Sequence, residues 1–229
     1  MGAVSSSESR GPVPAADPRV ERSRQAILTG ATAVFLRQGF DGARIDDIAR
    51  EAGVAKRTVY NVFADKEELF RATVLSAIGI AESFTTDLER TTARIVDAER
   101  DLPRVMRQLA VTVLRGPVLP LRRLLVSEAR RFPDLVVEYR QRAPEAVLRS
   151  LAGALAKFAD EGHLTLTDPN LAAEHLAFLT FGADLDRGMF DPEPPSARRI
   201  RARADAGTAV FLRAYRQARL TDQPAQAER

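Results

Sequence analysis

A cluster of basic, hydroxyl and amide side chains in the first third of the chain has the chemistry needed to bind DNA. It comprises Lys56, Arg57, Thr58, Tyr60 and Asn61. Arginine can donate two hydrogen bonds to the O6 and N7 atoms of guanine, while threonine offers a hydroxyl group and a methyl group for thymine. We therefore expect Arg57 and Thr58 to read base edges.

The elements that must position this cluster form a helix-turn-helix. Four apolar residues recur at helical spacing before it: Ile45, Ile48, Ala49 and Ala52. Gly53 tolerates left-handed backbone geometry and ends that helix, and a helix of about two turns begins almost at once. Val59 and Phe63, four residues apart, form its inward face. Because the N-terminal half of such a helix enters the major groove, residues 56–58 are expected to face DNA.

The remaining pattern predicts helices separated by glycine, proline and capping residues. The first runs over about residues 20–38 and stops at Gly39. Asp65 and Glu68 form a capping box that opens a long helix from Lys66. Further helices are predicted over residues 102–115, 119–131, 135–161 with an interruption at Pro144, 170–189, and 196–219. No strand-like alternation bounded by turns occurs, so we expect an all-α fold of about nine helices.

We expect four segments along the chain. Residues 1–18, rich in Ser, Pro, Gly and Ala, should form a disordered arm, and residues 19–75 the helix-turn-helix domain. Residues 76–220 should form a larger helical lobe, and residues 221–229 a disordered tail. A chain of 229 residues that is 45% hydrophobic can bury one sizeable core or two small ones.

The composition argues against an enzyme. The chain has no cysteine, only two histidines and no glycine-rich phosphate loop, so we expect no catalytic group, no metal site and no cofactor. Neither a signal peptide nor an apolar run of about 18 residues is present, which predicts a cytoplasmic protein without a membrane partner. Because the net charge is only +3, DNA affinity must come from a local cluster of charge.

Residues 24–75 closely resemble the DNA-binding domain of the TetR family of transcriptional regulators. The matching positions are Ile27, Ala31, Phe35, Gly39, Phe40, Ile48, Ala49, Ala52, Gly53, Val54, Thr58, Tyr60, Phe63, Lys66, Glu67 and Leu69. The resemblance implies a sequence-specific regulator, acting as a repressor, in which Tyr60 and Lys66 contact DNA phosphates. It also implies a homodimer on a palindromic, double-stranded operator.

The chain departs from the usual TetR pattern at several positions of the motif. Arg57 stands where glycine is common, Val62 where a histidine or tyrosine often contacts phosphate, and Ala55 where serine often caps the helix. Ala43 and Arg44 stand where threonine or serine commonly starts the preceding helix. We expect the two arginines to supply contacts that the valine and alanine lack, so the DNA sequence preference should differ from that of better-matched relatives.

The C-terminal lobe is similar to one class within the family, the AefR-like regulators. In the family this lobe binds an effector and pairs with a second subunit, so we expect a small, mainly apolar effector and dimerisation through the last two long helices. Candidate pocket residues place flexible, aromatic or polar groups on apolar helices: Met106, Leu109, Tyr139, Arg142, His175 and Phe178. Small residues suited to close helix packing are Ala172, Ala173, Ala177, Gly182, Ala206, Gly207 and Ala209.

Alternative interpretations remain open from the sequence. A ligand-responsive DNA-binding repressor is favoured over a small all-helical enzyme and over a nonspecific architectural DNA-binding protein. The small residues are also compatible with packing inside one chain. His175 shares an apolar helix face with Leu171 and Leu179, which favours a hydrogen-bonded core or interface histidine over a pocket residue.

Overall fold

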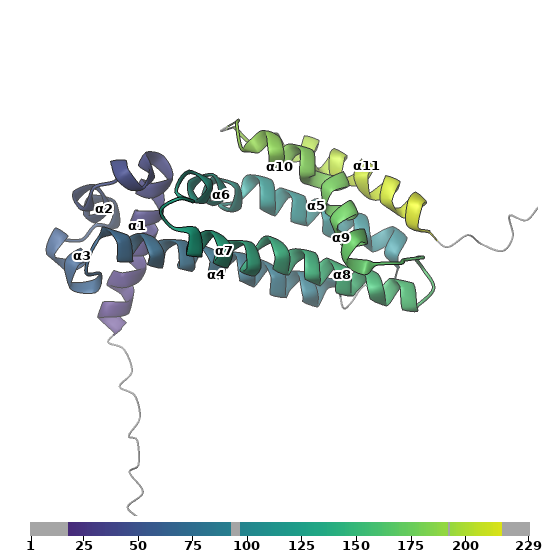
Figure 1. Ribbon diagram of the computed structural model, residues 1–229, viewed down its shortest axis with the longest axis horizontal. Coiled ribbons are helices and arrows are strands. Elements are labelled where there is room, and N and C mark those ends of the chain that lie inside the picture. Colours follow the sequence, from purple (N-terminus) through teal and green to yellow (C-terminus); the bar gives the residue numbers. More distant parts are fainter. Residues whose placement is uncertain (1–17, 93–96, 192, 217–229) are drawn as a thin grey trace, which may run out of the picture.

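The computed structural model describes residues 18–92, 97–191 and 193–216 (Figure 1). Its elements in chain order are α1 (Pro18–Gly42), α2 (Ile45–Ala52), α3 (Lys56–Val62), α4 (Lys66–Thr92), α5 (Ala98–Arg115), α6 (Val118–Ser127), α7 (Pro133–Arg142), α8 (Pro144–Asp160), α9 (Pro169–Ala177), the π-helical turn η1 (Phe178–Gly182), α10 (Ala183–Gly188) and α11 (Ala197–Tyr215). The described residues form no strand, and the predicted all-α class is confirmed.

The number of helices also agrees with the prediction. α7 and α8 correspond to one predicted helix with an interruption at Pro144, and α9, η1 and α10 follow one another without a gap. If α7 and α8 count as one helix, and α9, η1 and α10 as another, the described part of the chain contains nine helices. The predicted disordered arm, residues 1–18, lies outside the described residues except for Pro18, which begins α1. The predicted tail, residues 221–229, lies wholly outside them.

Two glycines shape the N-terminal head, which we define as α1–α3. At Gly39 the backbone leaves helical geometry (φ 70°, ψ −178°), so the regular part of α1 ends where predicted and Phe40 turns into the core. Gly53 adopts the left-handed conformation (φ 66°) at the C-terminus of α2, and the chain turns directly into α3. α2 and α3 therefore form the predicted helix-turn-helix beside α1 (Figure 1).

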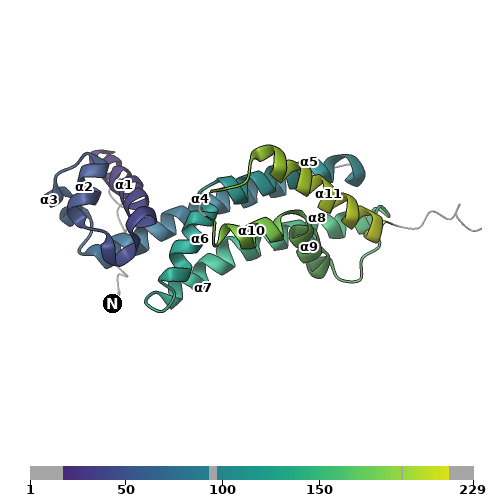
Figure 2. The same ribbon diagram turned by 90° about the horizontal axis from the view of Figure 1, so that it is seen from above.

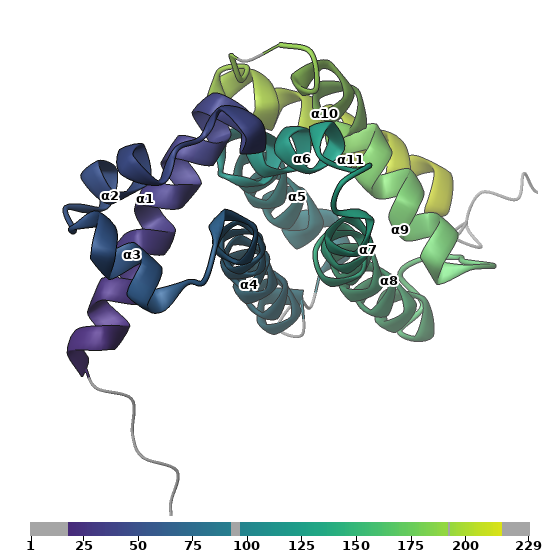
Figure 3. The same ribbon diagram turned by 60° about the vertical axis from the view of Figure 1, so that its left-hand side comes forward.

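The long helix α4 leads from the head into the lobe, which we define as α5–α11. The predicted capping box opens it: the Asp65 carboxylate accepts a hydrogen bond from the Glu68 N–H (2.8 Å), and the Glu68 carboxylate accepts one from the Ala64 N–H (2.6 Å). Figures 2 and 3 show α4 running away from the head, and in the lobe it contacts α7 and α8.

Capping residues also set the ends of the lobe helices. Asp168 caps α9 and Ser196 caps α11, as predicted. α5 begins earlier than the predicted residue 102, because the Asp97 carboxylate accepts hydrogen bonds from the backbone N–H groups of Glu99 (2.9 Å) and Arg100 (3.2 Å). α6 ends at Ser127, earlier than the predicted residue 131.

Two hydrophobic cores hold the molecule together. The first contains buried side chains of α1, α2, α3 and the N-terminal part of α4, together with those of α6 and α7. The second contains buried side chains of α5, α8, α9, η1 and α11. The boundary expected after residue 75 therefore does not separate the two cores, because α6 and α7 complete the core of the head.

Four buried phenylalanines join the head to the lobe inside the first core: Phe35, Phe40, Phe70 and Phe132. The ring centroid of Phe132, from the turn before α7, lies 5.1 Å from that of Phe40 and 4.7 Å from that of Phe70. The Phe35 and Phe70 centroids are 5.0 Å apart with perpendicular rings. Such aromatic pairs contribute about 0.5–1.5 kcal/mol each beyond the burial of their area.

Lys66, the first residue of α4, fastens this helix to the end of α1. Its Nζ donates hydrogen bonds to the carbonyl oxygens of Phe40 (3.0 Å) and Ala43 (3.2 Å), with the carbonyl oxygen of Asp41 at 3.4 Å. The ammonium also lies 4.6 Å from the centroid of the Phe40 ring. A cation at this position satisfies carbonyl groups that the break at Gly39 leaves without helical partners.

We expect Lys66→Met, which keeps the apolar stem and removes the ammonium, to lower the free energy of unfolding by about 2 kcal/mol, because hydrogen bonds to charged groups contribute about 1.5–3 kcal/mol. Urea denaturation followed by circular dichroism, at fixed protein concentration, measures this change. Lys56→Met is the matched control: Lys56 is exposed, so its loss should lower the free energy of unfolding much less than the loss of Lys66. Equal losses in the two variants would contradict the proposed role of Lys66.

Candidate DNA-binding interface

The outward side of α3 carries the residues predicted to contact DNA. Val59 and Phe63 are buried, 1% and 2% exposed, as the helical spacing predicted. On the other side Lys56, Arg57, Tyr60 and Asn61 are exposed and Thr58 is half-buried. α3 has only seven residues, so the burial of its apolar side holds the polar side out towards solvent.

The N-terminus of α2 presents a second basic group. Arg44 occupies the N-cap position of α2, is exposed, and accepts no hydrogen bond from the helix amides through its side chain. Ala55 likewise provides no side-chain cap for α3, so the predicted loss of both caps is confirmed. Uncapped amides at the positive end of the α2 dipole, next to a guanidinium group, favour an anion such as a DNA phosphate.

An ion pair connects the first turns of α2 and α3. The Nζ of Lys56 lies 2.9 Å from Oδ1 of Asp46 and 3.1 Å from its Oδ2. The hydrogen bond and the charge of Asp46 raise the pKa of Lys56 above its ordinary value. Asp46 has no local sequence signal that marks it as the partner of Lys56, because ten residues separate the two and the turn at Gly53 brings them together.

Lys66, expected to contact a DNA phosphate, also has partners inside the protein. Its ammonium is turned towards the backbone carbonyl groups at the end of α1. In this arrangement its donors are already used inside the protein. The structure therefore gives Lys66 a positioning role: it fixes the start of α4, and with it the turn after α3, to α1. No local sequence signal distinguishes these two roles.

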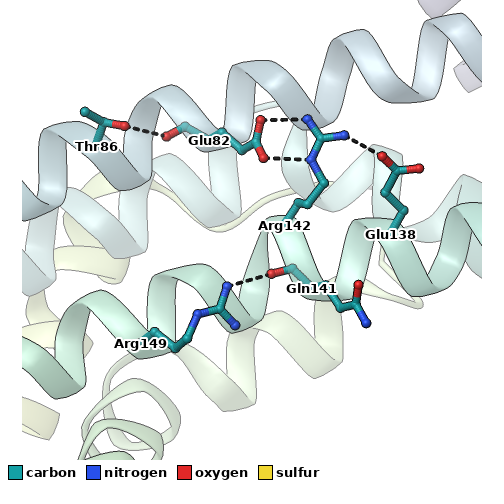
Figure 4. Close-up of polar contacts among 6 residues, drawn as sticks. All are labelled: Glu82, Thr86, Glu138, Gln141, Arg142 and Arg149. Atoms are coloured by element: carbon teal, nitrogen blue, oxygen red, sulfur yellow. Dashed lines mark hydrogen bonds and ion pairs between the residues drawn. The ribbon is translucent and has the colours of Figure 1, made fainter.

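Two arginine–carboxylate pairs fix α4 to α7. Near the head, Arg71 of α4 contacts Asp134 and lowers the pKa of that carboxyl. Further along, Arg142 of α7 donates to both carboxylate oxygens of Glu82 (2.7 and 2.8 Å) and to Glu138 (2.5 Å), as Figure 4 shows. Its hydrogen bonds and its charge lower the pKa of Glu82. Arg142, expected in a ligand pocket, instead joins two helices.

The other predicted pocket residues do not form one set. Met106 and Leu109 lie together on α5, where both are buried in the second core. Tyr139 is buried in the first core, and that burial raises its pKa. Only the two α5 side chains are therefore brought together.

His175 and Phe178, also expected in the pocket, both face outward. Phe178, on η1, is 67% exposed. His175 is exposed and its Nδ1 lies 2.6 Å from the hydroxyl oxygen of Tyr215. The expectation of a hydrogen-bonded histidine is thus confirmed, while its position is on the surface of α9 and not in the core.

Among the described residues, no group of three or more His, Cys, Asp or Glu side chains is arranged to hold a metal ion. No helix within the described ranges has the length and apolar character needed to cross a membrane.

Two family models match the chain. Residues 27–73 match the bacterial regulatory proteins of the TetR family, and residues 100–217 match the C-terminal domain of AefR-like transcriptional repressors. A solved structure, described as a TetR-family transcriptional regulator from Mesorhizobium loti, is 31% identical with a TM-score of 0.79, covering 88% of this chain and 100% of that chain.

Curated relatives agree with these matches. The transcriptional regulator SrpR of Pseudomonas putida is 40% identical over 84 residues, which span 35% of this chain and only 39% of SrpR. The regulator RutR of Escherichia coli is 26% identical over 184 residues, which span 76% of this chain and 77% of RutR. Both relatives are named as helix-turn-helix transcriptional regulators. The helix-turn-helix head, the helical lobe and both family matches lead to one conclusion: the chain belongs to the TetR family of transcriptional regulators.

Proposed function

We propose that the protein is a cytoplasmic, dimeric repressor that reads a palindromic operator with α3 and leaves it when a small, mainly apolar effector binds the lobe. The observation that carries the DNA-binding part is the exposed polar side of α3, whose apolar side is completely buried in the head. Among the described residues only Lys56 of this surface has a side-chain hydrogen bond or ion pair within the protein, to Asp46, so an external polar partner accounts best for a basic, aromatic and amide surface.

The side chains of this surface fall into two groups, those proposed to contact bases and those proposed to contact the DNA backbone. Arg57 and Thr58, in the N-terminal half of α3, are placed to read base edges in the major groove. Arg44 at the start of α2, with Lys56, Tyr60 and Asn61 on α3, supplies contacts to the sugar-phosphate backbone. Lys66 acts indirectly by holding these elements in place.

The dimer proposal rests on exposed apolar side chains at the outer side of the lobe. They come from α9, η1 and α11, which contact one another, and they are Leu171 (48% exposed), Phe178 (67%), Leu179 (45%) and Val210 (43%). Ala206 and Ala209 of α11 are exposed beside Val210 and would let a second helix approach closely. Exposed apolar and small side chains on three helices that contact one another support an isologous interface with a second copy.

Not all of the small residues serve that interface. Gly207 is buried, and a Cβ atom there would lie 2.2 Å from the carbonyl oxygen of Leu179, so this glycine permits α11 to pack against η1 within one chain. Ala172, Ala173 and Ala177 are likewise buried inside the lobe. Packing within the chain, the alternative left open by the sequence, therefore explains these positions.

The effector proposal rests on how the lobe is joined to the head. Met106 and Leu109 lie in the second core, which also contains α8, and α8 packs along α4. A ligand inserted beside these two side chains would displace α8 and α4 together, because Arg142 and Arg71 fix α4 to the neighbouring α7. α4 begins at Lys66, so its displacement would change the freedom of the head.

The first test of this function is base readout by Arg57. A duplex is selected from a random-sequence library by the wild-type chain, and binding to its single-base variants is measured by fluorescence anisotropy at fixed salt. Arg57→Ala should lose about 1–3 kcal/mol on the selected duplex and flatten the preference at one base pair. Arg140→Ala removes the same charge from an exposed position of α7 and should change neither. An unaltered base preference in Arg57→Ala would remove this residue from base readout.

The second test concerns the dimer. Phe178→Asp places a charge on the proposed interface, so sedimentation velocity should show a shift from dimer to monomer. Operator affinity should fall about 10²- to 10⁴-fold, because the two half-sites are then bound independently. Val126→Asp, which changes a 58% exposed valine of α6, is the control and should remain dimeric. A dimeric Phe178→Asp protein would place the interface elsewhere.

The third test concerns the effector. Apolar compounds are screened for a stoichiometric rise in the thermal midpoint of unfolding, and each one that binds is titrated by calorimetry with and without operator. If a compound weakens operator binding a hundredfold, about 2.7 kcal/mol of coupling, saturating operator must weaken its own binding by the same factor. Arg142→Met, which removes one of the two ion pairs that join α4 to α7, should reduce this hundredfold coupling. Equal affinity in both titrations would exclude the compound as an effector.

A further inference from the structure

The ion pair between Asp46 and Lys56 lies inside the proposed DNA-binding surface and not at its edge. Asp46 is the second residue of α2, two positions after Arg44, and Lys56 is the first residue of α3, next to Arg57. Both side chains of the pair are more than half exposed, 59% for Asp46 and 53% for Lys56. A negative group thus occupies a surface whose partner is a polyanion.

The Asp46–Lys56 ion pair affects nonspecific DNA binding and operator binding to different extents. Any DNA sequence offers phosphates, and nonspecific affinity comes almost entirely from cations that contact them. Lys56 can make such a contact only by sharing or leaving the Asp46 carboxylate, which then faces the phosphate and repels it. An exposed ion pair is weak enough to exchange partners, so the carboxylate lowers the affinity of the lysine for phosphate without blocking it.

Binding to the operator depends less on this exchange. There the base contacts of Arg57 and Thr58 fix the position of the head. They also contribute binding free energy that is absent when the head binds random DNA. A group that weakens phosphate contacts therefore reduces nonspecific binding by a larger factor than specific binding. Discrimination by such a repulsive element is a general route to specificity.

We propose that Asp46 is a specificity-determining residue, which restrains Lys56 and thereby suppresses binding to DNA that lacks the operator sequence. This inference rests on the proposed function, and it adds a residue that makes no favourable contact with the DNA backbone. The neighbouring Asp47 does not share this role, because it pairs within its own helix with Arg50 (3.0 Å) and leaves Lys56 untouched.

The experiment compares Asp46→Asn with the wild-type full-length chain on two duplexes: one selected from a random-sequence library by the wild-type chain, and one scrambled duplex of equal length and composition. We expect Asp46→Asn to bind the scrambled duplex about tenfold more tightly and the selected duplex less than about threefold more tightly, so that the ratio of affinities falls. On the scrambled duplex the slope of log K against log[salt] should steepen by about 0.9 per head, because each freed lysine adds one phosphate contact.

Three variants separate this mechanism from a simple change of charge. Asp47→Asn removes the same charge from the same first turn of α2, with the same effect on the helix dipole, and should leave the ratio of affinities unchanged. Asp46→Glu keeps the carboxylate and should restore most of the discrimination. In the double mutant Asp46→Asn with Lys56→Met, scrambled-duplex affinity should equal that of Lys56→Met alone, because the effect of Asp46 acts through Lys56.

The outcomes are distinguishable. A wild-type chain that binds no duplex better than the scrambled one refutes the proposed function and this inference together. If the wild type discriminates and Asp46→Asn keeps the same ratio, or if Asp47→Asn lowers the ratio equally, the inference alone fails. Thermal unfolding of each variant shows whether the head remains folded, and Asp46→Ala, which also removes the carboxylate, takes the place of Asp46→Asn if that variant does not fold.

Discussion

The position of Phe132 determines how the head is connected to the rest of the molecule. The side chain belongs to the turn between α6 and α7, yet it packs on Phe40 from the end of α1 and on Phe70 from α4. Three segments distant in sequence thus share one buried contact. Arg71 and Arg131 lie over the face of the same ring, 5.1 and 5.8 Å from its centroid, and shield it from solvent. Any movement of α6 or α7 must either carry the head with it or separate these rings.

The features that could be predicted from the sequence depend on neighbouring residues. Gly39 and Gly53 mark chain reversals because their backbone conformations are costly for other residues, and both have positive φ. Asp65 and Asp168 cap helices by reaching amides within three residues. The buried side of α3 follows from spacing alone. These local rules, together with the resemblance to a known family, were sufficient for the fold class, the helix-turn-helix and the exposed polar surface.

The features that could not be predicted depend on partners far along the chain. Nothing near Lys66 indicates that carbonyl groups some 25 residues earlier will surround its ammonium. Arg142 looked like a polar group on an apolar helix because its partner Glu82 is 60 residues away. His175 and Phe178 were placed on an apolar face correctly, but helical spacing cannot distinguish a face that meets the core from one that meets solvent. The contribution of α6 and α7 to the first core could not be predicted for the same reason.

The shared first core has a consequence for how regulators of this kind can diversify. The head and the first part of α4, residues 18–75, lack Leu121, Leu124, Phe132 and Leu135, which complete their shared interior from α6, α7 and the turn between them. A recombination event that joins this head to a foreign lobe would therefore leave Phe40 and Phe70 facing unmatched side chains. Exchange of DNA specificity by recombination should therefore succeed only when the crossover also transfers the α6–α7 segment. Substitutions confined to the exposed side of α3 offer a second route, because they can change the specificity without disturbing the first core.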